Sequence, residues 1–485
     1  MRRVLPILHV LGLVILIFSF TLLLPLAVAF IWRDAALSAY DEAFLITFSA
    51  GLLTWLLTRH NKRELQTRDG FLLVVLVWAV LPAFATLPLL NYLPHLSFTD
   101  AYFETASGLS TTGATVLAGL DTLPPSINLW RHLLNWLGGM GIIVLAVAIL
   151  PMLGIGGRQL FKAETPGPMK DSKLTPRIAD TAKSLWLVYA AITLACILAL
   201  KLAGMNWLDA VCHAFAAMGL GGFSTHDASV GYFNSPAIEA VLIVFMLIAA
   251  MNFATHFLAY RSRSLQAYRG DPEVLPMLVL VVVSCIGSAL YLWHAGTYAS
   301  YWTALRFVSF NLVSLATDCG FANADFNRWP IFVPLWMLFL SCVTVSSGST
   351  GGGIKMIRSL VMFKQSQREL QRQIHPAAVL PIKLGGMPIS NQVVFAVQVF
   401  VMLYVASIIA MTLILVASGL DFLTSFSAII ACINNAGPGL NQVGPATNFS
   451  VLTDFQTWVC TFAMLLGRLE LMTLFVLFTR TFWRA

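Results

Sequence analysis

Four segments of the chain each end in a glycine that follows an apolar stretch about half as long as a transmembrane helix. The glycines lie at similar intervals along the sequence and are Gly113, Gly222, Gly320 and Gly437. Glycine adopts positive φ angles at little cost, so a loop built around it can direct backbone carbonyls at a ligand. Rings of such carbonyls replace the hydration shell of a monovalent cation in channel filters. The four segments therefore predict a cation-binding ring made of backbone.

The elements that position these glycines share one plan. Each segment begins with an aromatic residue or an acid, continues as a short apolar helix and ends in small residues. A helix of this length cannot cross a bilayer, which needs about 20 apolar residues, so it must enter and turn back. Non-helical backbone lies at membrane depth only where it is buried in protein or lines a cavity. Glycines that merely let helices pack closely are the alternative, but four at equivalent positions favour a filter.

The composition indicates that lipid is the solvent for much of the chain. Of the 485 residues, 58% are hydrophobic and 11% are charged, and the mean hydropathy is +0.80. Soluble domains are about 25% charged. A soluble core does not explain this difference over so long a chain.

Ten apolar segments are predicted to cross the membrane. The first is too long for a signal peptide and lacks a small-residue cleavage site, so we expect it to remain as an anchor. The first two fall outside the fourfold pattern and predict an added hairpin. The ten segments lie near 4–32, 43–58, 71–92, 128–152, 184–203, 237–258, 274–293, 331–345 (continuing past a break), 392–418 and 456–479.

The predicted fold is an all-α integral membrane protein. Four repeated units of helix, pore helix, filter loop and helix surround a central pore. The N-terminal two-helix hairpin covers residues 1–69, and the four units cover 70–157, 158–270, 271–375 and 376–485.

The net charge of +7 is explained by membrane topology. Ten spans place both termini on one side, and most of the 29 Lys and Arg residues fall on that side. By the positive-inside rule those loops are cytoplasmic, which argues against a nucleic-acid surface. The opposite side carries acids that are expected to concentrate cations at the mouth. These acids are Asp34, Asp41, Glu42, Asp100, Glu104, Asp121, Asp209, Asp227, Asp325, Asp421 and Asp454.

Neither an enzyme nor a metal site built from side chains is expected. The seven cysteines lie in or beside apolar spans without a C-x-x-C pair, and no histidines cluster. Ser224, His226 and Asp227 are too close in sequence to converge as a catalytic triad. The run 348–355 departs from a phosphate-binding loop because isoleucine follows its last glycine.

A glycine-rich run from Ser346 to Lys355 interrupts the eighth span. Each glycine disfavours a helix by about 1 kcal/mol relative to alanine. The preceding apolar stretch, 331–345, is too short to cross alone, which places the break inside the bilayer. A loop just beyond the end of the membrane is the alternative.

Arg468 stands in the middle of the last span, where a charge costs about 2.5–3.5 kcal/mol on insertion scales. Glu470 is two residues away and does not share its helix face. Arg468 is therefore predicted to reach the pore or the glycine-rich run, with a plain structural pair as the alternative.

At these residues the chain resembles the Trk/Ktr/HKT superfamily of cation transporters, and the resemblance covers its whole length. The superfamily keeps about one glycine per filter loop, so its selectivity is expected to be less stringent than that of potassium channels. In this superfamily a serine at the first glycine goes with sodium permeation, so Gly113 favours potassium. The most specific matches are Ser110-Thr-Thr-Gly113, Gly221-Gly222-Phe, Asp318-Cys-Gly320-Phe and Asn434-Asn-Ala-Gly437-Pro.

The resemblance implies that potassium is held by backbone carbonyls, with no covalently bound cofactor. The expected ion-binding residues are Thr111, Thr112, Gly113, Leu220, Gly221, Gly222, Asp318, Cys319, Gly320, Asn435, Ala436 and Gly437. The resemblance also implies that the glycine-rich run is a gate beneath the filter. The expected gate residues are Gly348, Thr350, Gly351, Gly352, Gly353, Lys355 and Arg468.

The resemblance further implies a homodimer, each protomer holding its own pore, in the inner membrane of a bacterium. It implies a separate cytosolic regulator, a TrkA-type ring of nucleotide-binding domains. The expected docking segments are 157–183 and 364–383, although solvated charge explains them equally well.

The expected function is gated potassium uptake across the inner membrane, driven mainly by the membrane potential. A potential of 100 mV supplies about 2.3 kcal/mol per charge, enough for roughly a fiftyfold gradient. A proton- or sodium-coupled potassium symporter is the alternative, because a broken span also suits a carrier. A non-conducting scaffold does not explain four loops at one depth.

Overall fold

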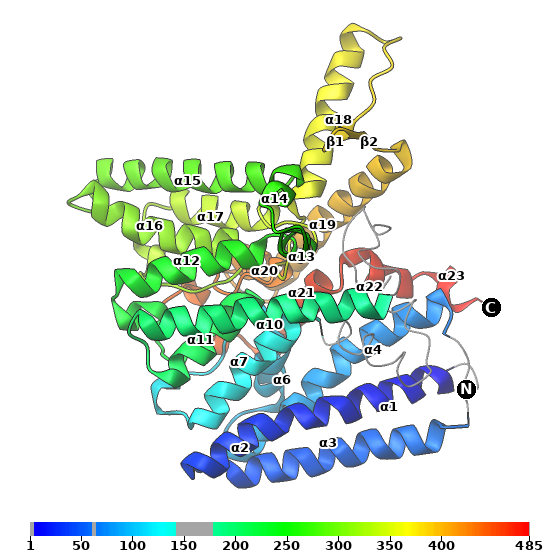
Figure 1. Ribbon diagram of the computed structural model, residues 1–485, viewed down its shortest axis with the longest axis vertical. Helices are drawn as coiled ribbons and strands as arrows, with labels where there is room; N and C mark the ends of the chain where they lie inside the picture. Colours follow the sequence, from blue (N-terminus) through cyan, green and yellow to red (C-terminus); the bar gives the residue numbers. More distant parts are fainter. Residues whose placement is uncertain (1–3, 61–64, 142–177, 485) are drawn as a thin grey trace.

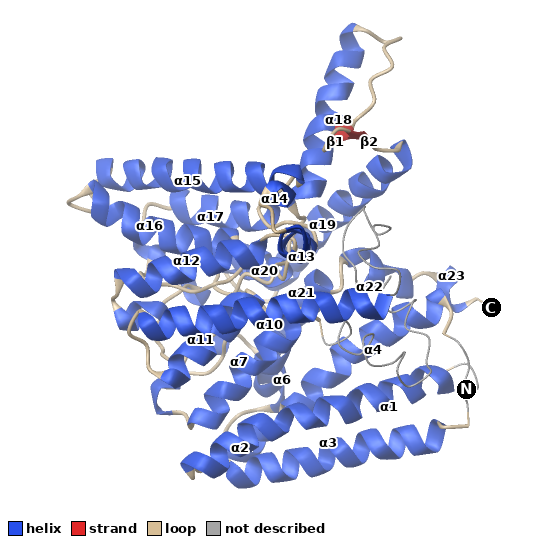
Figure 2. Ribbon diagram, viewed as in Figure 1, coloured by secondary structure: helices blue, strands red, loops and turns tan. Residues whose placement is uncertain are grey.

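The computed structural model describes residues 4–60, 65–141 and 178–484. Within these ranges the regular structure is helical apart from one antiparallel hairpin (Figure 2). The hairpin pairs β1 (Lys383–Leu384) with β2 (Met387–Pro388), and Lys383 lies opposite Pro388. The predicted all-α architecture is confirmed.

An N-terminal helical hairpin forms one edge of the molecule. It consists of α1 (Leu5–Ser19), η1 (Phe20–Leu22), α2 (Leu23–Trp32) and α3 (Leu37–Thr58). Helices α1 and α3 pack side by side (Figure 1). A Cβ atom on Gly51 would lie 2.6 Å from the backbone nitrogen of Leu16, so glycine allows the two backbones to approach closely.

The first two repeating units follow the hairpin. The first consists of α4 (Thr67–Ala85), α5 (Leu87–Tyr92), the half-helix α6 (Phe98–Leu109), η2 (Leu120–Thr122) and α7 (Pro125–Gly139). The second consists of α10 (Ile178–Leu202), the half-helix α11 (Trp207–Gly219), η4 (Ser229–Phe233), α12 (Pro236–Ala250), α13 (Phe253–Ser262) and α14 (Gln266–Gly270).

The last two units repeat the same order. The third consists of α15 (Val274–His294), the half-helix α16 (Tyr301–Ala316), η5 (Phe326–Arg328), α17 (Phe332–Val343) and α18 (Met356–Ile374). The fourth consists of α19 (Asn391–Ala417), the half-helix α20 (Phe422–Asn434), η6 (Asn441–Val443), η7 (Phe449–Val451), α21 (Asp454–Arg468), α22 (Leu471–Leu477) and α23 (Arg480–Trp483). The exact unit boundaries given above stay a prediction.

Two spans predicted to be continuous are sharply bent, so that part of the prediction is wrong. The sixth breaks by 95° between α12 and α13, and the tenth breaks by 111° between α21 and α22. Asn252 caps the new helix α13, and Glu470 has a φ of 53° before α22. Caps and positive φ angles end a helix without changing its hydropathy, which is why an apolar run did not reveal the bends.

Among the described residues, five helices are long and apolar enough to cross a membrane, or up to seven if each bent pair is one span. The predicted count of ten is therefore not reached by this criterion. Helix α7 stops at Gly139, where the described range ends shortly afterwards, and α17 has only 12 residues. The break predicted in the eighth span is confirmed, because 346–355 is not helical.

Large apolar side chains cover the outside of the long helices. Leu57 is 78% exposed, Leu202 is 89% exposed and Phe395 is 63% exposed. Soluble monomers rarely expose broad apolar patches, so this surface fits lipid. The protein is thus a multi-pass membrane protein.

Helix α18 projects from the body at the top of Figure 1, next to the hairpin and the start of α19. The predicted docking segment 364–383 lies on this projection. Most of the other, 157–183, falls outside the described residues. Helix α1 begins and α23 ends at the same end of the molecule (Figure 1), where Arg68 donates a hydrogen bond to the carbonyl of Arg484 at 3.1 Å.

Candidate functional site: four converging glycine loops and the segment beneath them

Three of the four half-helices begin at a side-chain cap. The capping residues are Ser97 for α6, Asn206 for α11 and Asp421 for α20, and each accepts a hydrogen bond from the amide three residues on. Ser300, before α16, makes no such bond. A cap fixes where a helix starts and so helps to determine where its loop lies.

The four half-helices end in loops of the same backbone conformation. The first loop is 111–113, the second 220–222, the third 318–320 and the fourth 435–437. The first residue of each has a positive φ, namely 57° at Thr111, 55° at Leu220, 63° at Asp318 and 58° at Asn435. The closing glycines also have positive φ, namely 79° at Gly113, 63° at Gly222, 91° at Gly320 and 87° at Gly437.

One hydrogen bond recurs in all four loops. The amide of the middle residue donates to the carbonyl five residues earlier, at 2.8 Å in every case; the donors are Thr112, Gly221, Cys319 and Ala436. Such a bond ends a helix after a left-handed residue and satisfies a carbonyl in the last turn. The fourfold repeat read from the glycines is therefore a repeat of backbone geometry.

The loops contact one another in a closed cycle. A Cβ atom built on Gly113 would lie 2.1 Å from the carbonyl oxygen of Gly221 in the second loop. A Cβ atom built on Gly222 would lie 2.0 Å from the carbonyl oxygen of Cys319 in the third loop. On Gly320 it would lie 2.7 Å from the carbonyl oxygen of Ala436, and on Gly437 it would lie 2.9 Å from that of Thr112. Each glycine thus abuts the middle carbonyl of the next loop, and the fourth loop returns to the first. The structure brings all twelve predicted filter residues together.

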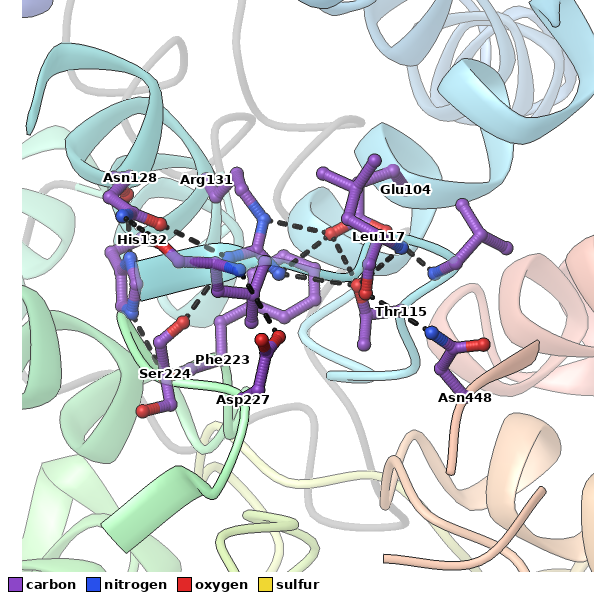
Figure 3. A network of polar contacts seen from close by, with 12 residues as sticks. Glu104, Thr115, Leu117, Asn128, Arg131, His132, Phe223, Ser224, Asp227 and Asn448 are labelled. Carbon is purple, nitrogen blue, oxygen red and sulfur yellow. Dashed lines mark hydrogen bonds and ion pairs between the residues drawn. The ribbon is translucent and has the colours of Figure 1, made fainter. Parts of the chain in front are cut away.

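A buried ion pair supports the first loop from behind (Figure 3). Glu104 on α6 and Arg131 on α7 are each 1% exposed, and their side chains lie 2.8 Å apart. The Glu104 carboxylate also accepts hydrogen bonds from the Thr115 hydroxyl at 2.9 Å and the Val116 amide at 3.0 Å. The chain that leaves the first loop is therefore attached to two helices.

Arg131 also joins the first loop to the second. Its Nη1 donates to the carbonyl of Ser224 at 3.2 Å, and its guanidinium lies over the ring of Phe223. His132, beside it on α7, has Nε2 at 3.0 Å from the carbonyl of Phe223 (Figure 3). On α11, His213 has Nε2 at 3.0 Å from the hydroxyl of Ser224. Charged and imidazole groups thus hold the outer end of the second loop.

Neutral groups support the other two loops. Behind the third, the Asn311 amide group donates to the side-chain oxygen of Asn323 at 2.6 Å. Behind the fourth, the hydroxyl of Ser427 accepts a hydrogen bond from the amide of Leu440 at 2.8 Å. Asn435 then donates to the hydroxyl of Thr112 at 2.9 Å, which joins the fourth loop to the first.

A cavity of about 80 Å³ opens above the loops and is lined by Gly113, Gly222 and Gly320. Asp227, His226 and Arg131 also line it. Several acids expected to concentrate cations at the mouth serve backbone amides instead: Asp34 accepts from Ser126, Asp227 from Gly119 and Asp421 from Thr424. These carboxylates therefore also hold local structure, and the expected concentration of cations at the mouth stays a prediction.

The glycine-rich segment 346–355 lies against the inner side of the loops. The amide of Gly352 donates to the carboxylate of Asp318 in the third loop at 3.1 Å. A Cβ atom on Gly352 would lie 2.0 Å from the carbonyl oxygen of Asn434, at the end of α20. The Thr350 hydroxyl donates to the carbonyl of Met218 on α11 at 3.1 Å. The segment therefore touches three of the four half-helix ends.

Two cations hold the glycine-rich segment. Lys355 donates a short hydrogen bond to the carbonyl of Gly351 within it. Arg468 donates to the carbonyl of Thr350 at 2.7 Å and to those of Gly138 and Gly139 at the end of α7. The predicted contact of Arg468 with this segment is present, whereas its part in gating stays a prediction. Glu470 pairs with Arg358 at 2.8 Å rather than with Arg468.

Sequence reasoning missed the groups that support the loops. Arg131 lies inside a predicted span, so its charge was a signal of a buried partner. Its pairing with Glu104 could not be read from a local pattern, because 27 residues separate the two.

A ring of backbone loops inside a body of long apolar helices defines a membrane transport protein of the pore-loop class. The chain belongs to the TrkH family of cation transport proteins, whose sequence profile matches residues 37–484. The resemblance drawn from the glycine motifs is thereby confirmed, and membership of a transporter family supports the prediction that the protein is not an enzyme.

Known relatives match the chain over nearly its whole length. The Trk system potassium uptake protein TrkH of Salmonella typhimurium is 47% identical over 477 residues, covering 98% of each chain. TrkH of Vibrio parahaemolyticus is 47% identical over 482 residues, covering 99% of each. TrkG of Escherichia coli strain K12 is 39% identical over 479 residues, covering 98% of each.

A solved structure has the same fold. The crystal structure of the potassium transporter TrkH from Vibrio parahaemolyticus superposes with a TM-score of 0.89 at 44% sequence identity, covering 99% of both chains. Identity at this level over the full length extends the similarity to the loops as well as the helices.

Proposed function

We propose that this chain takes up potassium through the ring of four glycine loops, under the control of the glycine-rich segment. The closed cycle of loop contacts is the observation that carries the proposal. Four backbone segments of equal conformation offer carbonyl oxygens to a single ion, as a cation filter requires. The relatives named as potassium uptake proteins support potassium as the ion.

In this proposal the ion exchanges its hydration shell for carbonyls of the twelve loop residues. The half-helices direct the negative ends of their dipoles toward the loops, which favours a cation there. Because each loop is short and contains about one filter glycine, few rings of carbonyls are stacked along the pore, and selectivity over sodium should be moderate rather than absolute. The glycines permit the close approach of neighbouring loops that sets the width of the ring.

The glycine-rich segment forms the gate, since it lies directly against the inner face of the third and fourth loops. Arg468 holds it there and places a positive charge beneath the ring. A cation leaving the filter meets that charge as an electrostatic barrier. Opening requires the segment and Arg468 to move together.

Uptake in this proposal is driven by the membrane potential across the inner membrane of a bacterium, with both termini in the cytoplasm. At about 2.3 kcal/mol per charge per 100 mV, no coupled ion is needed for accumulation. The protein works as a homodimer with a pore in each protomer. A TrkA-type ring of nucleotide-binding domains docks on the cytoplasmic side and controls the gate.

Rubidium-tracer uptake into proteoliposomes that hold the purified chain tests the filter. Potassium should compete strongly and sodium weakly. Gly113→Ser should reduce this contrast, because the added side chain meets the carbonyl of Gly221. Gly287→Ser is the matched control, since no atom lies within 4 Å of a Cβ atom there. Equal competition by the two ions in the unmodified protein would refute a potassium filter.

The same vesicles separate a channel from a coupled symporter. Channel flux should reverse when the applied potential reverses and should not respond to a pH or sodium gradient alone. Uptake that is driven by a proton or sodium gradient at zero potential would replace the channel with a carrier.

A further inference from the structure

Glu273 is a buried acid whose side-chain hydrogen bonds go to residues outside the four glycine loops. It directly precedes α15 and is 3% exposed. Its side chain makes no capping hydrogen bond to its own helix. Burial of a carboxylate is unfavourable unless hydrogen bonds compensate, so its partners indicate what it does.

Those partners bound the glycine-rich segment on both sides. Oε1 of Glu273 accepts hydrogen bonds from the amide of Ser347 at 2.9 Å and from the amide of Ile357 at 2.9 Å. Ser347 is the second residue of the segment, and Ile357 lies in the first turn of α18, just beyond its end. One oxygen atom thus joins the two ends of the segment.

The backbone around this point is fastened to neighbouring elements as well. The Ser346 amide donates to the carbonyl of Ala250 at 2.9 Å, and the carbonyl of Gly348 accepts from the amide of Phe253 at 3.1 Å. Asp271 accepts from the amide of Glu273 and from the hydroxyl of Thr255. The bend between α12 and α13 and the start of α15 therefore form one support for the segment.

We infer that Glu273 is a positioning residue for the gate: it keeps the glycine-rich segment closed against the filter loops by joining its two ends. The inference rests on the proposed function, because it assigns the closed state to the contacts of that segment. Arg468 holds the middle of the segment through Thr350, and Glu273 holds its ends. Since Ile357 belongs to α18, a displacement of that projecting helix is transmitted to the segment at Glu273.

The test measures basal rubidium uptake by the full chain in proteoliposomes, without any regulator. Glu273→Ala removes both hydrogen bonds and should raise uptake on the order of tenfold, with unchanged preference for potassium over sodium. Glu273→Gln keeps an oxygen that accepts both amides and should stay close to the unmodified protein. Rescue by glutamine and unchanged selectivity distinguish positioning of the gate from general loosening.

Glu239 supplies the matched control. It is also 3% exposed, but it pairs with Arg306 at 2.7 Å, away from the glycine-rich segment. Glu239→Ala should leave basal uptake unchanged. Equal rises in Glu239→Ala and Glu273→Ala, or no rise in Glu273→Ala, would overturn the inference.

Two further outcomes are decisive. If Glu273→Ala does not yield folded protein, Glu273→Asp is measured instead, because the shorter side chain keeps the charge but cannot reach both amides. Glu273→Asp should also raise basal uptake. Uptake by Glu273→Asp at the level of the unmodified protein would overturn the inference. No rubidium uptake by the unmodified protein or any variant would refute the proposed function itself. Uptake by the unmodified protein that Glu273→Ala does not exceed refutes this inference alone.

Discussion

The first and second glycine loops differ from the third and fourth in how they are supported, although their backbones are alike. Glu104, Arg131 and His132 lie behind the first pair, whereas amide and hydroxyl groups such as Asn311 and Ser427 lie behind the second pair. The glycines of the first pair also approach the next loop more closely, at 2.1 and 2.0 Å from a built Cβ atom against 2.7 and 2.9 Å.

This difference distinguishes the backbone conformation that all four loops share from the supporting side chains, which differ between the units. In the proposed filter an ion contacts backbone, so the positive φ angles and the recurring hydrogen bond must be present in all four loops. The groups behind the loops do not contact the ion and need only fix the backbone. The charged and imidazole supports lie behind the two loops whose glycines approach the next loop most closely.

Removal of Arg131 should have the largest effect, because it leaves Glu104 buried without its charged partner. Arg131→Gln is expected to destabilise the protein by about 3–5 kcal/mol, whereas Asn311→Ala should cost about 1–3 kcal/mol. Thermal unfolding in detergent measures both. The double variant Glu104→Gln with Arg131→Gln should recover part of the loss, since no unpaired charge remains. Similar losses for Arg131→Gln and Asn311→Ala would remove the distinction between the two pairs of loops.

A series of alanine substitutions at the four glycines tests the difference in packing. Gly113→Ala and Gly222→Ala should lower the preference for potassium over sodium at least about tenfold, since a shift of 1.4 kcal/mol at the ion suffices. Gly320→Ala and Gly437→Ala should lower it less, because the facing carbonyls are further away. Competition of potassium and sodium against rubidium uptake gives the ratio. A uniform loss at all four positions would show that positive φ, rather than contact distance, sets the cost.

The positions of the loops could be predicted from sequence because the relevant constraint is local. A glycine directly after a short apolar stretch can be recognised from the sequence alone, and the structure gives each of the four a positive φ. All twelve predicted residues lie in the four loops. The contacts that hold the glycine-rich segment could not be predicted, because Glu273 is separated in sequence from Ser347 by 74 residues and from Ile357 by 84 residues. The bends before Asn252 and Glu470 were missed because the chain stays apolar on both sides of each.

Substitution of Arg468 separates the proposed gate from the proposed filter. Arg468→Ala removes the hydrogen bonds to the carbonyls of Thr350, Gly138 and Gly139, and should raise basal rubidium uptake several-fold. Selectivity should not change, in contrast to the glycine series, because these contacts lie on the inner side of the loops. The double variant Arg306→Ala with Glu239→Gln is the matched control, because it removes an arginine at a distance from the segment without leaving a buried charge unpaired. Unchanged uptake in folded Arg468→Ala would remove this residue from the gate.

The last comparison concerns two buried carboxylates with different partners: Glu104 is paired with Arg131, whereas Glu273 accepts hydrogen bonds from backbone amides. Burial raises the pKa of Glu273 from 4.5 to about 7; the amides of Ser347 and Ile357 and the charge of Lys355 oppose this rise, and Asp271 adds to it. Ionised Glu273 is therefore less favourable in the folded state than in the unfolded state, which lowers the free energy of unfolding. The cost is absent below pH 4.5, grows as the pH rises to about 7, and is constant above that value.

Glu273→Gln carries no such cost, so its melting temperature relative to the unmodified protein should increase between pH 4.5 and 7 and level off at higher pH. The cost corresponds to at most about 3 kcal/mol, and partial hydration of the site would reduce it. Melting curves in detergent at several pH values measure the difference in melting temperature. Glu239→Gln is the control, because the carboxylate that it replaces is paired with Arg306. A difference that falls as the pH rises would mean that the ionised Glu273 stabilises the fold. In that case the acid would be explained by stability, and only the uptake measurements could then assign it to the gate.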